Sequence, residues 1–226
     1  MVHESQKTTD ARFDAARLRT VIGLGLILLV CGVVALFLEI DLQDFLLGVG
    51  ALTAAIVVAA GVGPRASLIG ARSLPRVSLI VVGASFLLLT PVVFLLSGIV
   101  MTIAMAMGAS SAVVSQIVLL GGAAIAAAPV LLCAVFAGLD LAVGGRVPAP
   151  WGWLALPALV LSVVVVAIKA GIAAASLMAW MAPWTDLYRT LTALQAVGAI
   201  VLGSVSLIFA AWASSVSAAD DDLRSG

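Results

Sequence analysis

The sequence has little of the material from which catalytic and metal sites are built. It holds one histidine, His3, and two cysteines, Cys31 and Cys133, among 226 residues. Metal centres draw mainly on these residue types and on clustered acids, and histidine is the most frequent general base. The scarcity argues against a metal site and a histidine-based active site. We expect no cofactor and no enzymatic activity.

Charge is equally scarce. Charged residues make up 10% of the chain, hydrophobic residues make up 64%, and the bases and acids balance at eleven each. A water-soluble fold of this length needs a polar surface that such a composition cannot supply. A net charge of zero also gives no reason to expect nucleic acid as a partner. The surroundings that suit this composition are a lipid bilayer.

What the sequence does contain is a series of long apolar runs. About 20 helical residues at 1.5 Å each cross a bilayer core of ~30 Å. The runs predict an all-α bundle of six transmembrane helices, at residues 20–40, 45–62, 77–100, 112–141, 153–179 and 187–213. Residues 1–19 form a polar, partly amphipathic N-terminal segment, and residues 214–226 form an acidic tail that we expect to be disordered.

The distribution of bases predicts the orientation of this bundle, because Lys and Arg concentrate on the cytoplasmic side of membrane proteins. With both termini in the cytoplasm, Arg189 is the only loop base outside, and the bases inside are Lys7, Arg12, Arg17, Arg19, Arg65, Arg72, Arg76, Arg146 and Arg224. The alanine- and valine-rich composition is typical of a GC-rich bacterial genome. We therefore place the chain in the bacterial cytoplasmic membrane.

Helix breakers and small residues shape the expected bundle. The segment 63–76 carries three arginines and is predicted to be a cytoplasmic loop, and 101–111 is predicted to be an external turn. Pro91 lies in the middle of the third span and predicts a kink. Close packing in lipid relies on small residues, and we expect it at Gly121, Gly122, Ala126, Gly171 and Ala174.

Lys169 is the one charged residue deep inside an apolar run. A lysine at the centre of a membrane helix costs about 2.5–3.5 kcal/mol and usually faces protein or a water-filled cavity. It lies roughly 15 Å from Trp180 by helix rise, which leaves two interpretations open. Either its stem carries the ammonium towards the outer head groups or contacts a carbonyl, or the ammonium binds an anion or a partner.

The acids available to Lys169 all lie at the outer boundary of the predicted bundle. They are Glu39, Asp41, Asp44 and Asp186. No carboxylate falls at the centre of any predicted span. We therefore expect a functional Lys169 to meet an anion, a backbone carbonyl or another chain.

Two further groups of side chains are candidate binding residues. Gln116 and Gln195 are the amides at membrane depth, where they join helices or contact a solute; the same choice applies to Thr53, Ser85, Thr90, Ser115, Ser162 and Ser204. Trp180, Trp184 and Tyr188 follow at steps of four in the segment WMAPWTDLYR. On a helix they share one face, which suits an interfacial anchor or a docking surface for a partner chain or an amphiphilic ligand.

Two functions are consistent with this pattern. The missing intramembrane acids and the short loops favour a non-enzymatic accessory or scaffold component that associates with other membrane subunits or with copies of itself. The alternative is a small transporter or channel for a small, anionic or amphiphilic solute, with Lys169 in the pathway. A redox role for Cys31 and Cys133 is a lesser alternative, because buried cysteines ordinarily pack as small apolar residues.

Overall fold

The computed structural model describes residues 15–62, 66–69, 73–108, 121–144, 147, 151–176 and 184–225, and in this part of the chain all regular structure is helical. The six helices are α2 (Ala15–Ala35), α3 (Ile40–Ala60), α4 (Ser73–Ala106), α6 (Ala123–Val143), α7 (Trp151–Ser176) and α8 (Trp184–Ser225). All six contain stretches long and apolar enough to cross a membrane. The prediction of six apolar helices is confirmed, and the chain is a multi-pass membrane protein by length and composition.

The start of α3 differs from the prediction in a way that matters for the site. The turn after α2 is tight, and hydrogen bonds from Phe37 N to Val34 O and from Leu38 N to Ala35 O, both 3.1 Å long, close it. Helix α3 then begins at Ile40 rather than at residue 45. Asp41 and Asp44 are therefore helical residues, and carboxylates near a helix N-terminus are favoured by its dipole.

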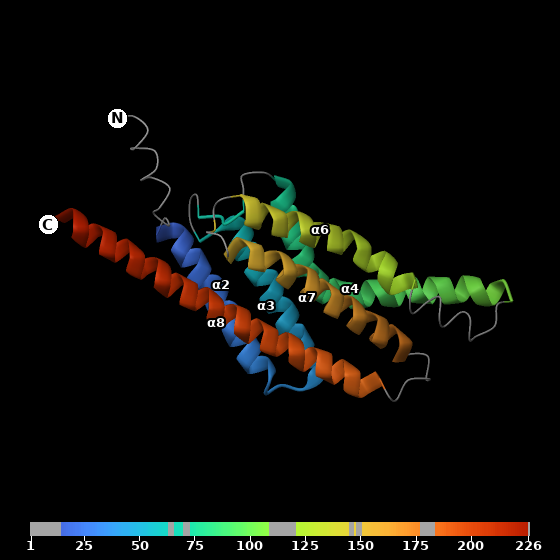
Figure 1. Cartoon of the computed structure of the whole chain (residues 1–226). Coiled ribbons are helices and arrows are strands. Elements are labelled where there is room, and N and C mark those ends of the chain that lie inside the picture. Colours follow the sequence, from blue (N-terminus) through green and yellow to red (C-terminus); the bar gives the residue numbers. More distant parts are fainter. Residues whose placement is uncertain are drawn as a thin grey trace.

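Two helices are longer than predicted. Helix α4 has 34 residues and continues through Pro91, and Figure 1 shows it changing direction between its N-terminal and C-terminal halves. It also extends to Ala106, so much of the expected external turn is helical. Helix α8 has 42 residues and reaches Ser225. The expected disorder of the acidic tail is wrong, because α8 continues to Ser225, and the segment after Ser214 contains no proline or glycine before residue 226.

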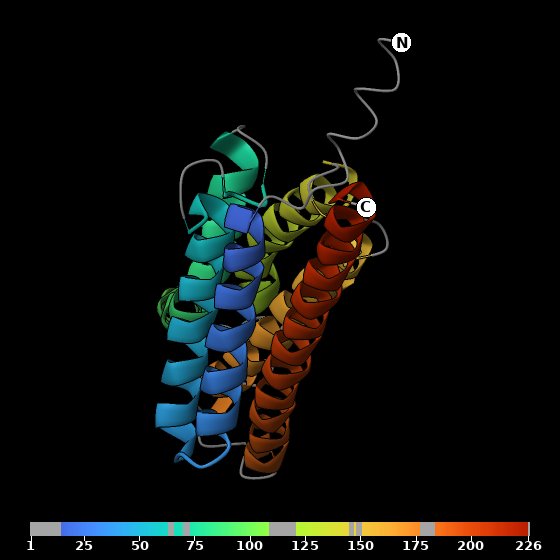
Figure 2. The same ribbon diagram turned by 90° about the vertical axis from the view of Figure 1, so that its left-hand side faces the viewer.

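Helix α2 lies between α3 and α8, as Figure 2 shows, while α4 packs on α6 and α7 and also joins α3. The contact between α2 and α8 is close because glycines face each other. A Cβ on Gly203 would lie 2.7 Å from the Gly25 carbonyl oxygen, and one on Gly32 would lie 2.8 Å from the Ala196 carbonyl oxygen. Small residues thus mediate packing as expected, but largely at other positions than those predicted.

Among the predicted small residues, Gly171 and Ala174 are buried and Ala126 is partly buried. Gly122 approaches Ser97, whereas a Cβ on Gly121 would meet nothing within 4 Å. The packing role expected of Gly121 is therefore wrong.

Residues 66–69 of the link between α3 and α4 are buried. Ala66, Ser67, Leu68 and Ile69 are each at most 4% exposed. The Ser67 hydroxyl donates to the Ala59 carbonyl at 2.7 Å. Gly61 turns the chain at a φ of 78°, and a Cβ there would lie 2.4 Å from the Ala66 carbonyl carbon. This part of the predicted loop is thus packed into the base of the bundle.

Candidate functional site

The candidate site is centred on Lys169, which α7 places inside the bundle. Its side chain is 6% exposed, and the ammonium forms an ion pair with Asp44 of α3. The ammonium also donates to Gln195 Oε1 at 2.7 Å and lies 5.0 Å from the centre of the Tyr188 ring. Lys169 therefore contacts two other helices, α3 and α8, which excludes the interpretation in which its stem leads the charge out to lipid head groups.

Asp44 receives two donors. One carboxylate oxygen accepts from Lys169 and the other accepts from the Tyr188 hydroxyl. Charge-assisted hydrogen bonds of this kind are stronger than neutral ones. The side chain of Asp44 is 25% exposed. Part of it therefore stays accessible while its two oxygens accept these hydrogen bonds.

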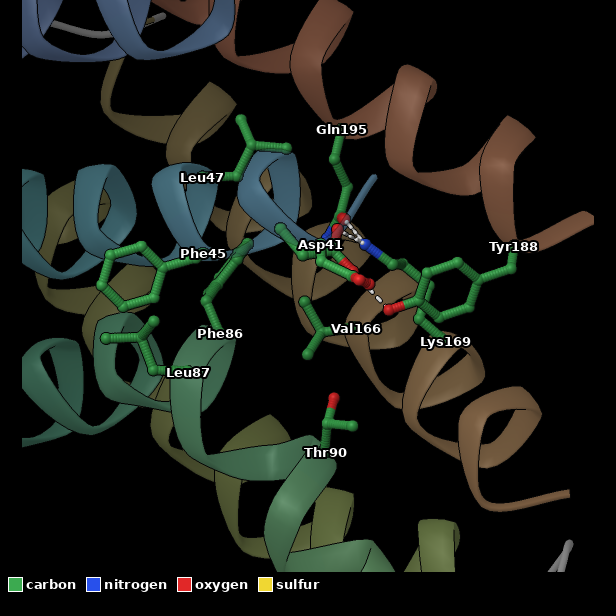
Figure 3. Close-up of a pocket in the computed structure, with 11 residues that line it drawn as sticks. Asp41, Phe45, Leu47, Phe86, Leu87, Thr90, Val166, Lys169, Tyr188 and Gln195 are labelled. Atoms are coloured by element: carbon green, nitrogen blue, oxygen red, sulfur yellow. Dashed lines mark hydrogen bonds and ion pairs between the residues drawn. The ribbon is translucent and has the colours of Figure 1, made fainter. Parts of the chain in front are cut away.

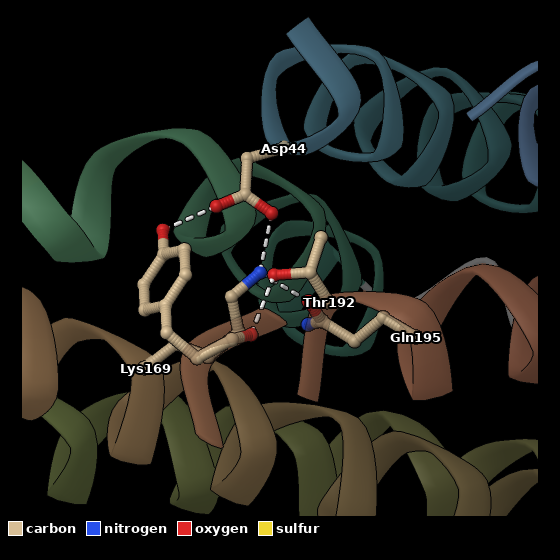
Figure 4. Close-up of polar contacts among 5 residues, drawn as sticks. Asp44, Lys169, Thr192 and Gln195 are labelled. Atoms are coloured by element: carbon tan, nitrogen blue, oxygen red, sulfur yellow. Dashed lines mark hydrogen bonds and ion pairs between the residues drawn. The ribbon is translucent and has the colours of Figure 1, made fainter. Parts of the chain in front are cut away.

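Tyr188 and Gln195 come from one face of α8, since seven residues make two helical turns. Thr192 lies between them and is fully buried. Its hydroxyl donates to the Tyr188 carbonyl at 3.0 Å, and Figure 4 shows this bond beside the ion pair. The local hydrogen bond satisfies a buried hydroxyl and leaves the two longer side chains to face Asp44 and Lys169.

These polar groups line a cavity of about 240 Å³, which we call the charged cavity. Figure 3 shows the lining side chains from four helices pointing towards a common space. They are Asp41, Asp44, Phe45 and Leu47 from α3, Phe86, Leu87 and Thr90 from α4, Val166 and Lys169 from α7, and Tyr188 and Gln195 from α8.

A backbone carbonyl adds to the polar groups near the charged cavity. Pro91 has no N–H, so it cannot donate to the carbonyl of Leu87, four residues earlier in α4. Leu87 and Thr90 both line the cavity. The bend of α4 therefore places an acceptor without its helical donor close to this space.

The formal charge of the cavity lining is −1, because the carboxylates of Asp41 and Asp44 face the one ammonium of Lys169. Lys169 already compensates Asp44, while Asp41 is exposed one turn earlier on α3. Three aromatic rings also line the space, those of Phe45, Phe86 and Tyr188. An excess acid beside aromatic faces suits a bound organic cation.

The structure brings together three of the predicted binding residues, Lys169, Gln195 and Tyr188. Gln116 and Trp180 lie outside the described residues. Trp184 begins α8, but its side chain lies outside the described part as well. The shared face expected of the two tryptophans and Tyr188 stays a prediction.

The expectation that Lys169 meets an anion, a backbone carbonyl or another chain is wrong, because its partner is Asp44. Asp44 is one of its four candidate acids, and the predicted start of the second span at residue 45 places it at the boundary. With α3 beginning at Ile40, Asp44 lies one turn inside the helix, and the long lysine stem covers the remaining distance. Asp41 was not singled out beyond this group, and Thr192 was not predicted at all.

The other polar side chains at membrane depth differ in their hydrogen-bond partners. Gln195 joins α8 to α7, as expected of a helix-joining amide. The hydroxyls of Thr53, Ser85 and Ser162 instead donate to carbonyls of their own helices. Ser115 lies outside the described residues.

The two cysteines are both free. A Cβ on Gly50 of α3 would lie 2.8 Å from Cys31 Sγ, whereas Cys133 packs against the core of α4, α6 and α7. Each thus has its own apolar surroundings, as in the packing interpretation of these residues. Among the residues that the structure describes, no three His, Cys, Asp or Glu side chains gather into a metal-binding group.

Comparison with protein-family models, with curated proteins and with solved structures finds no match for this chain. The geometry of the charged cavity is therefore the main guide to function.

Proposed function

We propose that this protein is a carrier of small organic cations in the bacterial cytoplasmic membrane, with both termini in the cytoplasm and no enzymatic activity. The observation that carries the proposal is the Asp44–Lys169 pair inside the charged cavity. The scaffold interpretation draws on the lack of acids at membrane depth and on the short loops. Asp44 lies one turn inside the candidate span Ile40–Ala60 and pairs with Lys169 of the span Trp151–Ala174, which weakens the first of these two grounds.

The pair suggests how a cation is admitted. In the resting arrangement, the ammonium of Lys169 occupies Asp44. A solute cation first meets Asp41 at the exposed part of the cavity and the rings beside it, then replaces Lys169 at Asp44. The displaced Lys169 ammonium can still donate to Gln195 Oε1. Because Asp44 passes from one cation to another, its carboxylate is never left without a charged partner during the exchange.

The test uses uptake of radiolabelled benzyltrimethylammonium into liposomes that hold the full chain, under an inside-negative potential. This cation has a permanent charge and so cannot cross lipid by losing a proton. We expect saturable uptake above that of protein-free liposomes. Asp44→Asn should abolish it, and Asp41→Asn should weaken it several-fold.

Asp186→Asn is the matched control, since Asp186 is an exposed acid in the first turn of α8 and is not part of the charged cavity. It should leave uptake unchanged. Uptake no greater than in protein-free liposomes, or an equal loss in Asp186→Asn and Asp41→Asn, would contradict the proposal. Full uptake by Lys169→Leu would contradict the role of the pair.

One observation favours an accessory subunit as a second candidate function. The C-terminal half of α4 continues beyond Pro91 and exposes large apolar side chains: Leu95 is 70% exposed, Ile99 57% and Ile103 53%. A surface of this kind suits another membrane subunit or a second copy of the chain. Copurification of a defined partner after mild solubilisation, lost in Leu95→Ala/Ile99→Ala, would support this role.

A further inference from the structure

A second cavity of about 260 Å³, which we call the apolar cavity, lies along the same helices as the charged cavity. Its lining is apolar apart from two serines, Ser162 and Ser206. Both hydroxyls donate to carbonyls of their own helices, at 2.7 and 2.8 Å. The apolar cavity therefore offers hydrocarbon contact and little for a polar group to bind.

The two cavities follow each other along four helices. Phe86 of α4 lines both. On α3 the lining passes from Leu47 to Ala51, on α7 from Val166 to Ser162, and on α8 from Gln195 to Leu202. Steps of four and seven residues keep the same helix face. The two linings thus meet at Phe86 and lie on the same helix faces.

Helices α7 and α8 pack loosely on each other beside the two cavities. Helix α8 packs mainly on α2 and makes few contacts with α7, although both helices line both cavities. From Gln195 to Ser206 the lining of α8 covers about 16 Å at 1.5 Å per residue. The gap in contacts between α7 and α8 is therefore the side from which we expect a molecule dissolved in the bilayer to enter.

We infer that the organic cation bound at the charged cavity carries a hydrocarbon chain and that this chain lies in the apolar cavity. The inference rests on the proposed function, which supplies the cationic head. The excess acid of Asp41 and the aromatic rings bind the head, and the largely apolar lining beyond Phe86 takes the tail. The ligand class is an alkylammonium amphiphile that enters from the lipid.

The probe is a dodecyltrimethylammonium with a photoreactive diazirine at the end of its chain, added to the full chain in lipid nanodiscs. Peptide mass spectrometry then identifies the labelled residues. We expect labels at residues of the apolar cavity such as Ser162, Leu202 and Ser206. Excess benzyltrimethylammonium, which has no chain and fits only the charged cavity, should remove at least nine-tenths of these labels.

Two variants separate the cavities. Ala158→Leu fills part of the apolar cavity and should lower labelling there about tenfold while benzyltrimethylammonium binding stays at the wild-type level. Ala128→Leu makes the same change at an exposed position of α6 outside both cavities and should leave both measurements unchanged.

The outcomes are distinct. If benzyltrimethylammonium binds but does not displace the label, or if labels fall only on exposed residues outside both cavities, such as Ile125 and Leu132, the tail assignment is wrong and the proposed function stands. If benzyltrimethylammonium does not bind at all, the proposed function is wrong and the inference falls with it.

Discussion

At the scale of the residue, loss of Asp44 and loss of Lys169 should reduce the stability of the fold by different amounts. The Lys169 side chain is 6% exposed, so Asp44→Leu leaves a buried ammonium without a carboxylate. We expect this change to destabilise the fold by about 3 kcal/mol. Lys169→Leu should cost less, because Asp44 is partly exposed and keeps the Tyr188 hydroxyl.

Titration of the folded protein from mild detergent into SDS measures both losses. The double variant Asp44→Leu/Lys169→Leu is the control, and it should regain most of the stability, because replacing both charges removes the unpaired one. Single-variant losses that simply add in the double variant would show that the two side chains are not coupled.

How far the sequence predicted this site is also decided residue by residue. Lys169 was identifiable because a lysine in an apolar run is costly in lipid. Gln195 and Tyr188 were identifiable by depth and by position. The contact between these side chains was not identifiable, because a sequence shows which residues share a face of one helix but not which helix faces pack together. The pairing with Asp44 further depended on the start of α3, and helix ends are the least certain part of any sequence-based assignment.

At the scale of the element, the α2–α8 contact is where a single methyl group decides the packing. A Cβ on Gly203 would lie 2.7 Å from both the Gly25 carbonyl oxygen and the Leu29 amide nitrogen. We expect Gly203→Leu to push the helices apart and to destabilise the protein by about 1–3 kcal/mol, the usual cost of overpacking.

Gly198→Leu provides the control for this prediction in the same helix, because a Cβ there would meet nothing within 4 Å. Both variants gain the same helix propensity relative to glycine, so the difference between their SDS midpoints reports the contact with α2. Equal midpoints would mean that α2 and α8 are not held at this distance.

The elements themselves were predictable to different degrees. Six helices follow from run length alone, because lipid leaves a backbone of this composition no other way to satisfy its hydrogen bonds. The lengths of α4 and α8 did not follow from the sequence. Both helices continue past the change from apolar to more polar residues that predicts a helix end. The burial of residues 66–69 also required the neighbouring helices to be in place.

At the scale of the whole molecule, the arrangement of the helices places the charged cavity at one end of the bundle. Helices α3 and α8 begin at that end, α7 ends there, and α2 begins and α8 ends at the opposite one (Figure 1). Arg17 and Arg19 lie near the start of α2 and Arg76 near the start of α4, at the opposite end, whereas Arg189 lies near the start of α8. The positive-inside rule then predicts that the charged cavity lies towards the outer side of the membrane.

Cysteine labelling in intact cells tests this orientation. On a Cys31→Ala/Cys133→Ala background, Leu38→Cys lies in the exposed turn between α2 and α3, and Ser214→Cys lies on the exposed surface near the other end of α8. A membrane-impermeant maleimide should label Leu38→Cys directly and Ser214→Cys only after permeabilisation. The reverse pattern would contradict the predicted orientation and place the mouth of the charged cavity in the cytoplasm.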